Sequence, residues 1–219
     1  MIKLYDSAFS PFARKVRMVL EHKGLAHEAI DGLLKSNHAA LKAVNGRIEV
    51  PVLVDGDIVV VNSPDIVAYV DHRYPDQPVL PEEPAARVHA RAWERLSDAF
   101  VDPIFVDISY WKWAERPDQM PQGLLDAARA DLRAVYTALE HELADRDFIS
   151  GTLSVADIAL FPHLASAKAM EAEFSDVLAG AAHAGAAQAL RGGRCAPDAA
   201  RILPTRSRHP RLSESNLAA

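Results

Sequence analysis

The sequence predicts two folded units, a mixed α/β unit followed by an all-helical unit. Short β-branched runs, which are typical of strands, occur early in the chain, whereas helical periodicity dominates its later part. Between them, prolines recur at every third residue from Pro75 to Pro84, a spacing that excludes helix and favours an extended connector. We therefore expect folded units at residues 1–76 and 85–180, and a basic tail rich in Ala, Gly, Arg and Pro at residues 181–219.

The first unit should begin with a strand and a helix. Residues Ile2–Tyr5 form a predicted buried strand, and Pro11–His22 a predicted helix. Gly24 should end this helix, because glycine readily adopts the left-handed conformation that follows many helix C-termini. Two β-branched runs, Val52–Val54 and Ile58–Val61, flank an Asp-Gly step and predict a hairpin.

Another helix of this unit is predicted to begin at Ser63, with Ser63 as the N-cap and Pro64 at the first helical position, and to run to about Tyr74. The resulting order, β-α-(β)-α-β-β-α, describes one compact sheet covered by helices.

Apolar stripes predict the helices of the second unit. One stripe steps by three or four residues over about five turns and consists of Leu125, Ala128, Leu132, Val135, Leu139 and Leu143. An earlier stripe, expected to face the core, consists of Val88, Ala92, Leu96 and Phe100. Ser154 and Asp157 form an acidic capping box, which predicts a further helix start.

The composition indicates a globular protein and excludes several classes. The 219 residues are 49% hydrophobic, with a net charge of -6, and the lone Cys195 excludes an internal disulfide or a CxxC site. No apolar run approaches the roughly 20 residues of a membrane span, and Met1 leads directly into the first strand without a signal peptide. We expect a cytoplasmic protein that binds no membrane and, because its body is acidic, no nucleic acid.

Motifs for several chemistries are missing from the sequence. It contains no GxxxxGK[ST] or GxGxxG phosphate loop, no HExxH and no GxSxG, and its nine histidines lack metal-binding spacing. We therefore expect neither a metal nor a cofactor.

Two helix starts remain as candidate sites. Ser10 follows the first strand and is either a simple N-cap or a hydroxyl placed to stabilise a thiolate beside the positive end of a helix. Pro51 enters a strand and is a candidate cis-proline that leaves a backbone edge for an extended ligand. Ser63 offers a second helix N-terminus, suited to a carboxylate.

These segments together resemble the glutathione transferase family. Ser10-Pro11-Phe12-Ala13 stands where thioredoxin-like proteins carry CxxC, and Asn62-Ser63-Pro64-Asp65-Ile66 is similar to the family's Glu/Gln-Ser-x-Ala-Ile segment. Ser154-Val155-Ala156-Asp157 resembles the capping motif of its helical domain. The resemblance implies an α/β thioredoxin-like N-terminal domain followed by an all-α C-terminal helical-bundle domain.

The resemblance also implies residue roles. Ser10 would be catalytic, as in serine-class members, by donating a hydrogen bond to the glutathione thiolate, with Tyr5 as the rival. Residues that would bind glutathione are Glu49, Val50, Pro51, Asn62 and Ser63. Two of these depart from the family pattern, because Glu49 would repel the glycyl carboxylate and Asn62 is shorter than Glu or Gln.

Aromatic residues are candidates for the second substrate's pocket. Phe9, Phe12, Tyr110 and Trp113 could contact a hydrophobic electrophile, although core packing is the more common role of such residues. The implied function is a glutathione transferase, with glutathione as co-substrate, a detoxification role and a homodimeric state. Alternatives are a glutathione-dependent isomerase or dehalogenase, and a binding protein without activity. The tail at 181–219 lacks the family's usual helical pattern and is expected to be divergent and loosely packed, or to reflect a frame shift.

Overall fold

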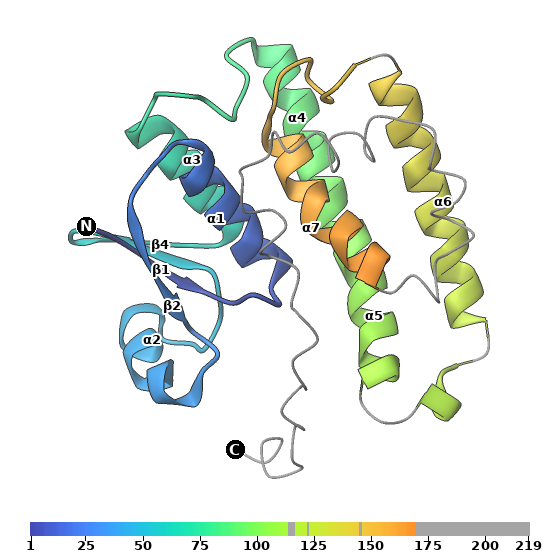
Figure 1. Cartoon of the computed structure of the whole chain (residues 1–219), viewed down its shortest axis with the longest axis horizontal. Coiled ribbons are helices and arrows are strands. Elements are labelled where there is room, and N and C mark those ends of the chain that lie inside the picture. Colours follow the sequence, from blue (N-terminus) through green and yellow to red (C-terminus); the bar gives the residue numbers. More distant parts are fainter. Residues whose placement is uncertain (114–116, 122, 145, 170–219) are drawn as a thin grey trace.

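The computed structural model describes residues 1–113, 117–121, 123–144 and 146–169. It contains an α/β unit beside a helical unit, with the long helices of both standing side by side (Figure 1). The predicted tail at 181–219 and the end of the second predicted unit lie outside the described residues. Within the described residues, no helix is both long enough and apolar enough to cross a bilayer.

A four-stranded sheet forms the centre of the first unit. Its elements in chain order are β1 (Ile2–Asp6), α1 (Pro11–His22), β2 (His27–Asp31), η1 (Lys35–Asn37), α2 (His38–Asn45), β3 (Val52–Asp55), β4 (Ile58–Val61) and α3 (Ser63–Arg73). The strand order is β2-β1-β3-β4, with β1 parallel to β2 and the other two pairs antiparallel. The predicted hairpin and the predicted element order are therefore confirmed.

The two faces of the sheet bury different side chains. Leu4 and Leu53 join the core formed with α1 and α3, whereas Tyr5 and Val52 point to the other face and pack with Leu41 of α2. This division follows from the alternation of side chains along a strand. The C-terminal end of β1 leads through a short loop to the start of α1, where Ser10 lies.

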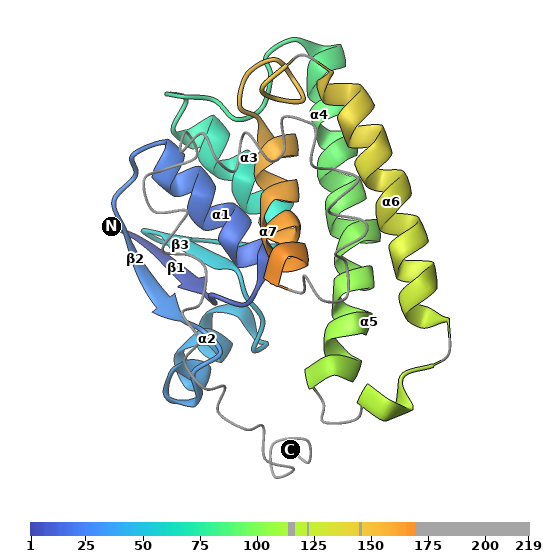
Figure 2. The same cartoon turned by 45° about the vertical axis from the view of Figure 1, so that its right-hand side comes forward.

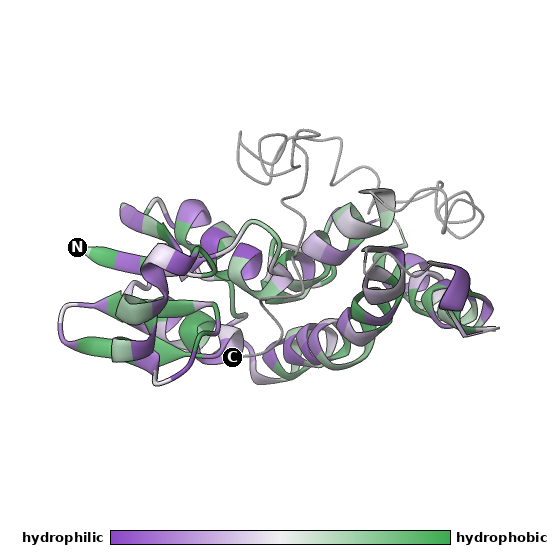
Figure 3. Cartoon of the chain, turned by 90° about the horizontal axis from the view of Figure 1, so that it is seen from below, coloured by the Kyte–Doolittle hydropathy of each residue, from purple (hydrophilic) through white to green (hydrophobic). Residues whose placement is uncertain are grey.

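The second unit is entirely helical in its described residues. It contains α4 (Pro84–Leu96), a π-helical turn η2 (Ser97–Val101), α5 (Asp102–Trp113), η3 (Pro117–Gln119), α6 (Leu124–Leu143) and α7 (Val155–Ala169). Helix α7 packs between α1 and α4 and joins the two units (Figure 2). Hydrophobic and hydrophilic residues both occur along the helices of the two units (Figure 3), and in α1 and α4 they lie on different sides, as expected for helices that cover a core.

The stripe predicted for α6 is confirmed, but the stripe predicted for α4 is wrong. Five of the six α6 positions are buried. On α4, by contrast, Val88 is 70% exposed and Phe100, in η2, is 42% exposed. The buried face instead contains Ala90, Trp93, Glu94 and Ser97. These residues also step by three or four positions, but Glu94 and Ser97 are polar. Their hydrogen-bonding groups find partners distant in sequence, at Lys15 and Ala159, and hydrophobic periodicity gives no sign of such partners.

The capping box at the start of α7 is confirmed. The Asp157 Oδ2 atom accepts hydrogen bonds from the Ser154 backbone N–H and hydroxyl, each at 2.9 Å, and Oδ1 accepts one from the Ile149 N–H at 2.9 Å. The bond from the Ser154 N–H satisfies one of the donors that a helix start leaves without an intrahelical partner, and the bond from Ile149 ties the preceding loop to it. They fix the start of the helix that contacts both units.

Lys23 anchors the proline-rich connector. Its buried ammonium donates to the backbone carbonyls of Tyr74, Asp76 and Gln77 at 3.0 to 3.2 Å, and forms an ion pair with Asp71 at 2.8 Å. Asp71 also accepts hydrogen bonds from the N–H groups of the connector residues Val79 and Leu80. The connector is therefore held against the first unit by charge-assisted bonds.

Candidate functional site

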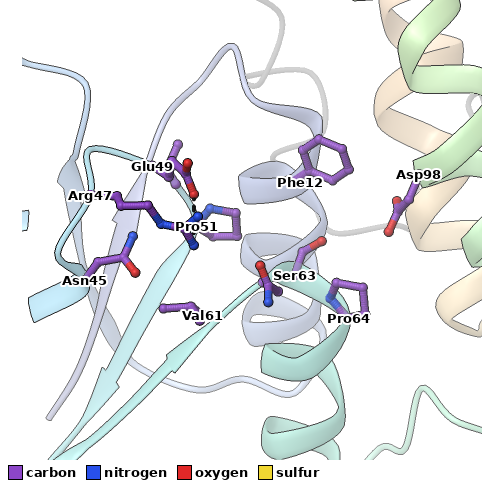
Figure 4. A pocket seen from close by; sticks show the side chains of 11 residues that line it. Phe12, Asn45, Arg47, Glu49, Pro51, Val61, Ser63, Pro64 and Asp98 are labelled. Atoms are coloured by element: carbon purple, nitrogen blue, oxygen red, sulfur yellow. Dashed lines mark ion pairs between the residues drawn. The ribbon is translucent and has the colours of Figure 1, made fainter.

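A pocket of about 200 Å³ lies between the start of α1, the segment before β3, the start of α3 and the turn η2 (Figure 4). Its lining residues come from both units and are Phe12, Asn45, Arg47, Glu49, Val50, Pro51, Val61, Asn62, Ser63, Pro64 and Asp98. All five predicted glutathione-binding residues are among them. The structure thus brings together residues that the sequence separates into four segments, at Phe12, at 45–51, at 61–64 and at Asp98.

Val50 and Pro51 form the centre of the pocket wall. The Val50–Pro51 peptide bond is cis, as the sequence predicts. Val52 is the first residue of β3 that pairs with a neighbouring strand, so the backbone of Val50 lies two residues beyond the paired part of the sheet. An extended peptide at this position could pair with Val50 as an added strand does.

Gly32 lies directly behind Val50. A Cβ atom added at Gly32 would stand 2.5 Å from Val50 Cγ1, closer than real Cβ atoms approach, and 3.1 Å from Leu41 Cδ2, which is a tight contact. Sequence reasoning does not single out Gly32, because the contact joins the residue after β2 to the residue before cis-Pro51. Gly32 is therefore a positioning residue for the pocket wall.

Replacing Gly32 by alanine is expected to lower the free energy of unfolding by about 1–3 kcal/mol, because the new methyl group overpacks the space against Val50. Chemical denaturation would measure this change. Gly24→Ala is a useful contrast, since no atom lies within 4 Å of its added Cβ and only the positive φ of 64° opposes it. If Gly32→Ala does not alter affinity for a pocket ligand, Val50 does not need this support.

The start of α3 differs by one residue from the prediction. Asn62, not Ser63, is the N-cap, and Ser63 is the first helical residue with only 3% of its surface exposed. Asn62 has φ 66° and ψ 127°, and a positive φ is uncommon for a residue other than glycine. Its amide donates to Asp65 Oδ2 at 3.4 Å.

Ser10 is the N-cap of α1, and its Oγ atom accepts a hydrogen bond from the Ala13 N–H at 3.2 Å. A serine hydroxyl has one donor and two acceptor sites, so capping does not use its proton. Capping and thiolate stabilisation are therefore compatible roles. Ser10 itself does not line the pocket, but Phe12, in the first turn of α1, does.

Tyr5, the rival of Ser10, lies in a different environment. Its side chain is 7% exposed and packs with Leu41 and Val52 on the α2 face of the sheet. Neither Tyr5 nor its phenol oxygen contributes to the pocket lining.

Arg47 accompanies Glu49 at one end of the pocket. The Arg47 guanidinium and the Glu49 carboxylate form an ion pair at 3.3 Å, drawn as a dashed line in Figure 4, and their side chains are 61% and 58% exposed. Sequence reasoning considers Glu49 alone and misses Arg47, although the two residues are only two positions apart. The negative charge at this end is thus matched by a positive one.

Asp98 reaches the pocket from the helical unit. It lies in η2, faces the pocket across from Phe12 and Ser63 (Figure 4), and pairs with the buried Lys15 ammonium of α1 at 2.5 Å. Lys15 also pairs with Glu94 of α4 at 3.1 Å. Burial raises the pKa of Asp98, and Lys15 opposes this effect. Sequence reasoning misses Asp98 because only the packing of the two units brings it to the pocket.

The predicted electrophile residues are dispersed. Phe12 lines the pocket, whereas Phe9 is 64% exposed. Tyr110 is 63% exposed and makes an edge contact with Trp111 at a ring distance of 5.3 Å. The side chain of Trp113 lies outside the described part of the chain.

Two titratable residues lie near Asp98 on the helical side. Burial, together with the charge of Asp98, raises the pKa of Asp102 from its ordinary value of 3.8 to about 6. Burial, with smaller effects of Lys15 and Arg14, lowers the pKa of His163 to about 3. The two side chains approach to 4.0 Å, and the neutral His163 ring stacks on Phe105.

The Asp102 shift implies a pH dependence of stability. A carboxyl group with a raised pKa in the folded state favours folding less as the pH rises from about 4 to about 6, because the folded protein prefers the protonated form. Asparagine does not titrate, so the free energy of unfolding of Asp102→Asn minus that of the natural chain should increase from pH 4 to pH 6. Urea denaturation at pH 4, 5 and 6 would measure it; an unchanged difference would contradict the assigned environment of Asp102.

A thioredoxin-like α/β unit joined to a helical unit, with a pocket at a cis-proline and two helix N-termini, is the architecture of glutathione transferases. Comparisons with known proteins agree. A model of the glutathione S-transferase N-terminal domain matches residues 4–78, and a model of the glutathione S-transferase C-terminal domain matches residues 122–214.

Individual relatives give the same result. The chain is 29% identical over 151 residues to glutathione S-transferase U2 of Arabidopsis thaliana, covering 68% of this chain but only 63% of that relative. It is 30% identical over 160 residues to glutathione S-transferase U22 of the same plant, covering 72% and 69% of the two chains. The crystal structure of a glutathione S-transferase from Rhodospirillum rubrum F11 is 26% identical, with a TM-score of 0.66 and coverage of 76% and 78%. The chain belongs to the glutathione S-transferase family.

Proposed function

We propose that this protein is a glutathione transferase that activates the thiol of glutathione for attack on a hydrophobic electrophile. The observation that carries the proposal is the pocket in which Val50, cis-Pro51 and Ser63 meet beside the N-terminus of α1. In this proposal the Val50 backbone pairs with the cysteinyl residue of glutathione, and the start of α3 holds the γ-glutamyl carboxylate through Ser63.

Ser10 is the proposed catalytic residue. Its hydroxyl donates a hydrogen bond to the sulfur, and the attacking atom belongs to glutathione rather than to the protein. Ionising most of a thiol with a pKa of about 8.5 at pH 7 requires a depression of about 2 units, or about 2.7 kcal/mol. A hydrogen bond to a charged group supplies about 1.5–3 kcal/mol and a helix dipole about 0.3–1 kcal/mol, so the site is sufficient in magnitude.

Asp98 compensates for the neutral side chain of Asn62. The ammonium group of the γ-glutamyl residue needs a nearby negative charge, which the amide of Asn62 does not provide. Asp98 faces Ser63 across the pocket, and its carboxylate, which already pairs with Lys15, would be shared with the ammonium group. Phe12 provides apolar surface on the side from which an electrophile would approach.

We also propose that the protein is a homodimer. Large apolar side chains are exposed on the edge strand β4, at Ile58 and Val59, and on α4 at Val88, where a second copy would cover them. Sedimentation velocity of the full chain would measure the assembly state.

Retention on immobilised glutathione and turnover of an activated aryl halide together test the proposed activity. Release of the retained protein by free glutathione would separate specific binding from adsorption to the matrix. If the protein is retained but does not turn over the aryl halide, haloacids and cis-trans dienoic acids should be tested as substrates of a dehalogenase or an isomerase. Retention without turnover of any of these substrates would indicate a binding protein without activity. The absence of both retention and turnover would contradict the proposal.

A further inference from the structure

The end of the pocket at Arg47 and Glu49 carries no net charge, and this bears on which thiol the protein accepts. The inference rests on the proposed function. A tripeptide that is extended along Val50, with its γ-glutamyl carboxylate at Ser63, must place its other end away from α3. Figure 4 shows Asn45, Arg47 and Glu49 together on that side of Pro51, opposite Ser63 and Pro64. The glycyl carboxylate of glutathione would therefore meet the ion pair.

The ion pair removes most of the attraction that Arg47 alone would exert. A ligand carboxylate near the pair feels the guanidinium and the Glu49 carboxylate at similar distances, and their opposite charges nearly cancel. A ligand carboxylate that binds the guanidinium directly must share its donors with Glu49, whose carboxylate already contacts one guanidinium nitrogen at 3.3 Å. A ligand without a carboxylate at this end is not affected by either the cancelled attraction or the competition with Glu49.

We propose that Glu49 is a specificity-determining residue: by pairing with Arg47 it removes the preference of the pocket for ligands with a free glycyl carboxylate over ligands in which this carboxylate is masked. The protein consequently accepts γ-glutamyl thiol peptides whose C-terminal carboxylate is masked as an ester or amide about as well as glutathione itself. Arg47 is the residue through which Glu49 acts, because it is the positive group of the pair.

The test compares two thiols in the full chain. The ratio of kcat/KM for glutathione to kcat/KM for its glycyl monoethyl ester, measured with one aryl halide at pH 7, is expected to be near one. Glu49→Gln frees Arg47 for the ligand and should raise this ratio about fivefold, the effect of one partly exposed charge. Arg47→Gln should lower it below the natural value. Glu82→Gln removes an equal charge from the exposed connector and should leave the ratio unchanged.

Each outcome decides the inference. A ratio above about ten in the natural chain, or a ratio that Glu49→Gln does not change, overturns the role of Glu49 while the proposed activity stands, since turnover is then observed. Calorimetric titration with both thiols gives the same ratio for binding if the aryl halide is a poor substrate. If neither thiol binds or reacts, the proposed function itself fails, and the inference fails with it.

Discussion

Ser10→Ala is expected to lower kcat/KM for glutathione conjugation by about ten- to one-hundredfold. The variant removes the proposed hydrogen bond to the thiolate, an interaction with a charged group worth about 1.5–3 kcal/mol. The apparent pKa of the bound thiol should rise by about 1–2 units for the same reason, so that activity recovers in part at higher pH. A pH–rate profile of both proteins with a fixed aryl halide would measure the two effects.

Ser10 also caps α1, so a loss of activity must be separated from a loss of structure. Removing the cap costs about 1 kcal/mol of stability, which leaves most of a typical domain folded. Ser10→Thr keeps both the hydroxyl and the capping acceptor and serves as the matched control. An unchanged rate and an unchanged profile in Ser10→Ala would exclude the serine, and Tyr5→Phe would then be the next variant to measure.

Lys15→Met is expected to lower the free energy of unfolding by about 3–5 kcal/mol, because it leaves the buried Glu94 carboxylate and the partly buried Asp98 carboxylate without their shared cation. Lys15 has 1% of its side chain exposed and pairs with Glu94 at 3.1 Å and Asp98 at 2.5 Å. Arg91 would then be the cation left beside Glu94. A loss of this size is a large fraction of the stability of most domains.

Chemical denaturation followed by tryptophan fluorescence would measure the effect of Lys15→Met. Lys42→Met changes the same residue type on the exposed side of α2 and should alter stability by no more than about 0.5 kcal/mol. The double variant Lys15→Met with Glu94→Gln should recover part of the loss, since it removes one stranded charge. Equal stabilities of Lys15→Met and Lys42→Met would contradict the buried ion pair.

Local signals account for the parts of the fold that the sequence predicts well. The Asp-Gly hairpin, the helix that begins after Ser10 and the capping box of Ser154 and Asp157 each depend on residues a few positions apart. Their physical causes are turn geometry and the satisfaction of backbone donors, which short segments contain. The same holds for the apolar stripe of α6, whose helical spacing can be recognised within the one segment.

Long-range contacts account for what the sequence does not predict. The buried face of α4 includes Glu94 because Lys15, distant in the chain, neutralises it. Asp98 enters the pocket for the same reason, and Gly32 matters because Val50 and Leu41 lie against it. Such contacts join segments across the fold, so neither periodicity nor a motif indicates them.

The anchoring of the connector by Lys23 and Asp71 has a consequence for recombining the two units between family members. Because Lys23 and Asp71 together bind Tyr74, Asp76, Gln77, Val79 and Leu80, a crossover among the prolines would divide one hydrogen-bonded assembly between two parents. The Val79 carbonyl also accepts a hydrogen bond from the Val155 N–H at the start of α7. A functional chimera should therefore inherit residues through Leu80 with the first unit and bring a compatible α7 N-terminus with the second.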